Sequence, residues 1–155
     1  MEDQRPETYK HIAEVRRQII KIMDELDFRA QDHDKSKLES PEREIFDEYT
    51  PKLKGTTYGS DEYKQNLKEM KVALDHHYKH NRHHPEHFKN SYTNGKWNPL
   101  SSMNLVDIIE MLCDWKAATL RHADGDIHKS IDINQKRFGF SDELTQIFHN
   151  TVDLF

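Results

Sequence analysis

The chain has 155 residues, of which 34% are hydrophobic and 33% charged, and this length predicts one domain with a single core under a highly charged surface. The net charge of −5 disfavours binding to extended nucleic acid, which requires a basic face. A single cysteine, Cys113, excludes an intrachain disulfide, and no signal-like or membrane-spanning apolar stretch is present, so we expect a cytoplasmic protein that does not enter a membrane.

Apolar residues recur at three- and four-residue steps through most of the chain, which predicts helices. The first helix is expected from Pro6 to Leu26 and a short second one from His33 to Leu38. Ser40 and Pro41 are typical of a helix start, which predicts a third helix over residues 41–49 that stops before Pro51. A long helix should begin after a cap at Ser60 and end in a group of histidines, because Pro85 disfavours helical geometry at the residue before it.

Residues 85–101 form the longest irregular segment, and a loop of this length in a compact domain is often functional. A strongly apolar helix should follow and reach about His122, with a turn at Asp124-Gly125 and further helices over 127–138 and 141–154. No strand is predicted. The sequence therefore predicts an all-α fold, a single bundle of six or seven helices over residues 1–155. Helices in residues 124–155 either complete the bundle or form a homodimer surface.

The dipeptide His33-Asp34 is the first sign of a metal site, because an imidazole and a carboxylate can share one divalent cation. Six of the eleven histidines lie between residues 76 and 87. His77, His80 and His84 share one helical face. Asp114 lies in an apolar helix, where a carboxylate is costly unless it is paired or binds a metal. His11 adjoins an apolar stripe and is expected to point partly inward.

Each of these residues also has a structural explanation. A run of histidines is usually a solvated surface, and His11 alone is more often a hydrogen-bonded core residue. Asp114 has Lys116 and Arg121 as possible ion-pair partners. Lys37 lies three residues after Asp34, so it suits either a helical ion pair or a phosphate-binding role as a point charge. It is the combination of ligand types on three separate segments that favours the metal site.

The ordered set resembles the HD-domain superfamily of metal-dependent phosphohydrolases, whose ligand order is H…HD…H…H(H)…D. The resemblance covers roughly residues 8–121. It is closer still to small uncharacterised HD-like families of bacteria and phages, with the signature HD-x-SK followed by H-x3-N-x-HH-x-E. These elements correspond to His33-Asp34-Lys35-Ser36-Lys37 and to His77, Asn81, His83, His84 and Glu86. By this match His80 lies outside the motif. No Gly-Tyr-Pro motif is present, which disfavours a cyclic-di-GMP phosphodiesterase.

The resemblance implies hydrolysis of a nucleotide or other small phosphoester by metal-activated water, with one or two divalent ions among which Mn, Fe, Co, Ni and Zn are not distinguished. It implies catalytic roles for Asp34, Lys37 and Glu86, with Glu86 orienting a histidine or accepting a proton. Substrate phosphate would be bound by Lys37, Arg82 and Arg121. The implied metal ligands are His11, His33, Asp34, His77, His83, His84 and Asp114.

Two other functions remain open at this point. Some HD-fold proteins with a similar ligand set are non-haem di-iron oxygenases, and histidine with carboxylate suits both chemistries. A metal-stabilised helical module could instead bind a nucleotide or protein without turnover.

Overall fold

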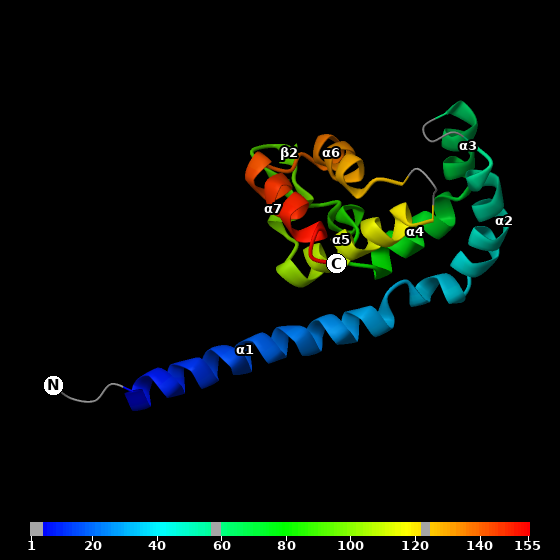
Figure 1. Cartoon of the computed structure of the whole chain (residues 1–155). Coiled ribbons are helices and arrows are strands. Elements are labelled where there is room, and N and C mark those ends of the chain that lie inside the picture. The colour runs from blue at the N-terminus through cyan, green and yellow to red at the C-terminus, as the bar shows by residue number, and fades with distance from the viewer. Residues whose placement is uncertain (1–4, 57–59, 122–124) are drawn as a thin grey trace. The chain divides into compact units, whose positions relative to one another are not determined.

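The computed structural model describes residues 5–56, 60–121 and 125–155 and is mostly helical (Figure 1). It contains seven α-helices within these ranges, so the prediction of an all-α fold with six or seven helices is confirmed. The chain divides into two compact units, residues 1–33 and 34–155. The expectation that both belong to one domain stays a prediction. None of the described helices is long and apolar enough to cross a membrane.

Over residues 5–33, which the structure describes, the first unit contains one helix, α1 (Arg5–Asp32). It runs six residues past the predicted end at Leu26, because residues 27–32 contain neither glycine nor proline to stop it. Glu7 in the first turn and Arg29 in the last turn both interact favourably with the helix dipole. Its apolar residues recur on one face, so α1 taken by itself is an amphipathic helix.

The second unit begins with the short 3-10 helix η1 (Lys35–Leu38), followed by α2 (Glu42–Lys54), α3 (Asp61–Glu69) and α4 (Lys71–His80). Helix α2 begins one residue later than predicted and continues through Pro51 to Lys54, which costs only one backbone hydrogen bond close to its C-terminal end. The long helix predicted after Ser60 is two helices that meet at the buried Met70. Ser60 caps α3 as predicted, since its Oγ accepts a hydrogen bond from the backbone N–H of Tyr63.

The long loop after α4 carries two 3-10 turns, η2 (Pro85–Phe88) and η3 (Pro99–Ser101), around a two-residue hairpin of β1 (Tyr92–Thr93) and β2 (Lys96–Trp97). Neither the hairpin nor these 3-10 turns were predicted from the sequence, which indicated an irregular segment over residues 85–101. The turn of the hairpin is Asn94-Gly95, and both residues have positive φ (52° and 75°). Asn-Gly is the pair that favours this turn geometry.

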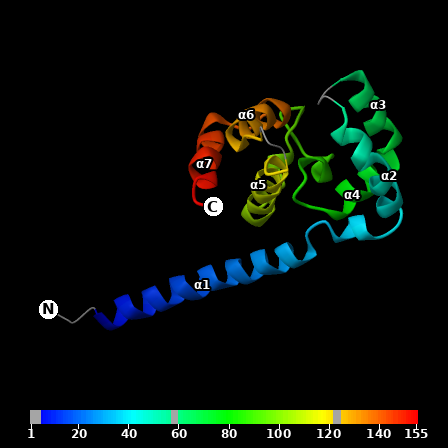
Figure 2. The same ribbon diagram turned by 45° about the vertical axis from the view of Figure 1, so that its right-hand side comes forward.

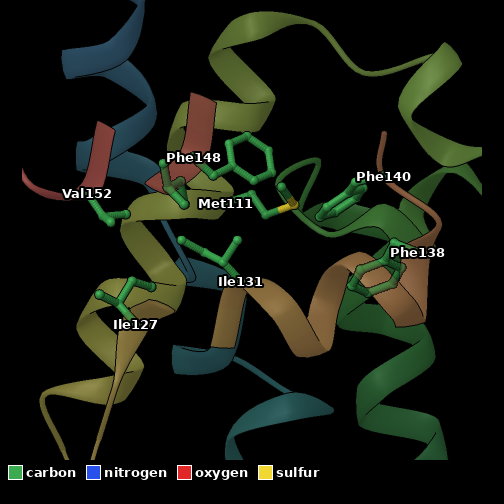
Figure 3. Packing of buried hydrophobic residues seen from close by; sticks show 8 residues of the cluster. Met111, Ile127, Ile131, Phe138, Phe140, Phe148 and Val152 are labelled. Carbon is green, nitrogen blue, oxygen red and sulfur yellow. The ribbon is translucent and has the colours of Figure 1, made fainter. Parts of the chain in front are cut away.

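Helices α5 (Leu105–Thr119), α6 (Ile127–Phe138) and α7 (Asp142–Val152) lie side by side in both ribbon views (Figures 1 and 2). Their facing side chains form the main hydrophobic core, in which Met111 and Leu112 of α5 pack against residues of the other two helices (Figure 3). The C-terminal helices thus complete the core of this unit. The predicted end of α5 at His122 and part of the turn at Asp124-Gly125 lie outside the described residues. Asn104 starts α5 with a capping box, in which Asp107 is the reciprocal partner.

Candidate metal centre

Asp34 is the first residue of the second unit and precedes η1 in a left-handed backbone conformation (φ 57°, ψ 12°). This region is uncommon for residues other than glycine, although aspartate is enriched in it. Backbone strain of this kind concentrates at functional sites. The Asp34 side chain is 19% exposed and faces three histidines of the same unit.

His77, His83 and His84 bring their ring nitrogens to the Asp34 carboxylate, and one ligand atom of each of the four residues lies within 4.8 Å of all the others. Nε2 of His77 is 3.3 Å from Oδ1 of Asp34, and Nε2 of His83 is 3.5 Å from the same oxygen. Nε2 of His84 is 2.8 Å from Nε2 of His77. His77 comes from α4, while the other two follow the end of that helix, where the extended backbone of His84 before Pro85 folds the chain back. This cluster can hold a metal ion.

Glu42, in the first turn of α2, orients His77 from behind. Its carboxylate is fully buried and accepts a hydrogen bond from Nδ1 of His77 at 2.8 Å. Because a carboxylate only accepts, this bond places the His77 proton on Nδ1 and leaves the Nε2 lone pair directed at the cluster. The other Glu42 oxygen lies 2.6 Å from Nδ1 of His76.

Two residues of the HD-like signature support this pair. Ser36 Oγ donates to Oε2 of Glu42 at 3.0 Å and accepts from Nδ2 of Asn81 at 2.8 Å. Asn81 also donates to the backbone carbonyl of His77 at 2.9 Å. Ser36 and Asn81 therefore connect η1 and α4 behind the metal-facing side of the histidine.

A second carboxylate stands behind His83. Oε1 of Glu110, on α5, lies 2.9 Å from Nδ1 of His83, and both side chains are buried. Two carboxylate–histidine pairs, one with its carboxylate on α2 and the other with its carboxylate on α5, thus meet at the Asp34 cluster. This is the usual arrangement around a metal, where a carboxylate fixes the ring and raises its basicity. Neither Glu42 nor Glu110 was predicted from the sequence to act at this centre.

The remaining predicted ligands are placed differently. Asp114, also on α5, has a carboxylate oxygen within 4.8 Å of one of Asp34, so it extends the acidic side of the centre. His33 is the last residue of the first unit and is joined to Asp34 by their peptide bond. His11 lies on α1, which continues unbroken to Asp32, about 30 Å further along the helix axis. The prediction that His11 and His33 bind the same ion therefore does not hold within one chain.

The predicted catalytic and phosphate-binding residues divide into two groups. Lys37 stays at the centre, with its ammonium 2.6 Å from Oδ2 of Asp34. Arg82 is instead held by the buried Asp107 through two hydrogen bonds of 3.2 and 2.9 Å. Glu86 pairs with Arg137 of α6 at 2.5 Å and so does not orient a histidine. Arg121 is exposed just after the end of α5.

His80 does not join the cluster. Its ring is exposed, and Nδ1 donates to the backbone carbonyl of His76 at 2.8 Å. His87 likewise donates from Nδ1 to the carbonyl of Tyr78 at 2.8 Å. The signature thus identified the cluster histidines better than helical spacing, which had favoured His80.

The environment lowers the pKa of His77 and of His84 and so favours their neutral forms, which metal ligands require. Burial, together with the neighbouring rings of His83 and His77, lowers the pKa of His84 to about 2. Burial is also the main cause that lowers the pKa of His77, followed by the charge of Lys37. Both rings therefore present a free lone pair at neutral pH.

These shifts predict that the metal-free protein loses stability as the pH falls below 6.5. The unfolded chain takes up protons at His77 and His84 near that pH, while the folded chain does not, so acid favours unfolding. A histidine that is protonated only in the unfolded chain contributes a slope of at most about 1.4 kcal/mol per pH unit. Urea unfolding with a chelator at pH 7.5, 6.5 and 5.5 measures the effect. A free energy of unfolding that stays constant or rises as the pH falls from 7.5 to 5.5 would contradict this prediction.

Comparisons with known proteins give a family but no function. No curated protein and no solved structure matches the chain. Residues 1–154 match DUF5662, which is described as a family of unknown function, and the chain therefore belongs to that family.

Proposed function

We propose that the second unit is a metal-dependent phosphohydrolase that acts on a nucleotide or another small phosphoester. The observation that supports this most is the convergence of three histidine nitrogens on Asp34, with buried carboxylates behind two of them and Lys37 beside it. Three imidazoles and a carboxylate suit a divalent transition ion such as manganese, iron, cobalt, nickel or zinc. Asp114, whose carboxylate lies near that of Asp34, would add a further oxygen ligand on the same side.

The divalent ion would supply an activated water and neutralise charge on the phosphoryl oxygens. Hydrolysis breaks the bond between phosphorus and the leaving oxygen, and water provides the new oxygen on phosphorus and the proton of the leaving group. Lys37 would bind a non-bridging phosphoryl oxygen as a point charge, since its ammonium already lies beside the ligand carboxylate. Glu42 would keep the proton of His77 on Nδ1 throughout.

Hydrolysis of nucleoside monophosphates and 4-nitrophenyl phosphate by protein loaded with manganese or cobalt tests the proposal. In this assay Lys37→Gln should lower kcat/KM by about 100-fold, as loss of a charge-stabilising donor does, with the metal content unchanged. Lys35→Gln is the matched control, because Lys35 lies on the same short helix but is exposed. Equal loss in both variants would contradict the role of Lys37.

The same preparation distinguishes the two other functions. If the iron-loaded protein consumes oxygen and the manganese- or cobalt-loaded protein releases no phosphate, the protein is an oxygenase and the hydrolase proposal is wrong. Metal binding without phosphate release or oxygen consumption would indicate a metal-stabilised binding module.

A further inference from the structure

A pocket of about 410 Å³ opens in the second unit beside the metal centre. Five of its six lining residues belong to α2, and the sixth is Lys37 of η1. Phe46, Thr50 and Lys54 follow one another at four-residue steps, so they share one face of that helix. Asp47 and Pro51 complete the wall.

Two of the lining residues also contact the metal centre. The Lys37 ammonium lies 2.6 Å from Asp34 Oδ2 and 5.2 Å from the centroid of the Phe46 ring. The Phe46 ring in turn meets the ring of His77 edge-on, with centroids 5.9 Å apart. The pocket therefore adjoins the centre through Lys37 and Phe46, and a molecule whose phosphate lies at Lys37 would extend along α2.

The chemistry of the pocket changes along this direction. Phe46 offers an aromatic surface next to the centre, and Lys54 in the last turn of α2 places a cation at the other end. Within the described residues no ion pair involves Lys54, whereas its neighbour Lys52 pairs with Glu48 at 2.7 Å. An unpaired lysine in a pocket wall suits an anionic group of a ligand, and the two lysines together suit a ligand with two such groups.

We propose that this pocket binds the non-reacting part of the substrate, and that Lys54 binds a second anionic group carried by that part. The ligand class is thus a small organic phosphate with a flat or apolar middle and a second anion. The inference rests on the proposed function for the position of the reacting phosphate.

The test compares adenosine 5′-monophosphate with adenosine 3′,5′-bisphosphate, which differ by one anionic group. Calorimetric titration of the metal-loaded protein should give a dissociation constant about fivefold lower for the bisphosphate, equivalent to about 1 kcal/mol, as expected for one solvent-exposed ion pair. Lys54→Gln should abolish this difference, and Lys54→Glu should reverse it. Lys52→Gln is the matched control on the same helix and should preserve it.

The outcomes separate the two proposals. A preference for the bisphosphate that depends on Lys54 supports the pocket even if neither nucleotide is hydrolysed, in which case only the proposed function fails. Hydrolysis with the preference unchanged in Lys54→Gln overturns the pocket and leaves the hydrolase. Failure of the metal-loaded protein to bind either nucleotide at millimolar concentration also overturns the pocket.

Discussion

Replacing Asp34 with alanine is expected to abolish metal binding at the candidate centre. Oδ1 of Asp34 lies within 3.5 Å of the ring nitrogens of both His77 and His83, and its carboxylate also approaches that of Asp114. Asp34 thus belongs to the cluster with the three histidines and also lies beside Asp114. Loss of a partner that only orients a ligand already costs about 10- to 100-fold in affinity, so the loss of this ligand should cost more than about 100-fold.

Elemental analysis of purified protein, before and after reconstitution with manganese, iron, cobalt or zinc, measures this loss. A thermal melt with and without metal gives a second readout, since an ion at about 100 times its dissociation constant stabilises the fold by about 2.7 kcal/mol. Asp75→Ala is the matched control, because Asp75 is exposed on α4 and pairs with Lys71. If Asp34→Ala keeps the same metal content and thermal shift as this control, Asp34 is not a metal ligand and the assignment of the centre is wrong.

The helices could be predicted from the sequence because their signals are local. Ser60 and Ser141 cap α3 and α7 through their own hydroxyl groups, as expected from residue type and position. The break at Met70 was missed, since neither glycine nor proline marks it and it accompanies the burial of that side chain. Helix ends depend on tertiary packing in such cases.

The residues that the structure brings together around Asp34 were candidates from the sequence because their side chains are typical metal ligands and their order resembles a known signature. Glu42 could not be predicted, since an acidic residue in the first turn of a helix is ordinary and normally exposed. Only the packing of α2 against α4 buries it against His76 and His77. One available signal was Ser36, whose place in the signature makes sense once its hydroxyl is seen to bind Glu42.

His11 shows the opposite error. Its residue type and its place in the ligand order favoured a role as a ligand, but ligand order says nothing about distance along a continuous helix. No residue between His11 and Asp32 interrupts α1, so its rise alone separates the two ends. Residue type therefore identified candidate metal ligands, and the length of α1 excludes His11 from the ion that Asp34 would bind.

Replacing Glu42 with glutamine should weaken metal binding by about 10- to 100-fold while the protein stays folded. The amide keeps the size of the side chain, but it is a weaker acceptor than the carboxylate for the Nδ1 proton of His77. Glu42→Ala should in addition lower the free energy of unfolding by about 3–5 kcal/mol, because it leaves buried partners of a charged group unpaired. Metal affinity is measured by competition with a chelator, and stability by urea unfolding of the metal-free protein.

Glu44→Gln is the control for Glu42→Gln, since Glu44 lies two residues further along α2, is exposed, and pairs only weakly with Arg43 at 3.1 Å. A purely structural role for Glu42 predicts lower stability in Glu42→Gln with unchanged metal affinity in the protein that remains folded. A role in orienting His77 predicts the reverse, a loss of affinity that exceeds the loss of stability. Because metal-free stability and metal affinity are measured separately, equal affinity in Glu42→Gln and Glu44→Gln would show that the buried carboxylate does not act on the metal centre through His77.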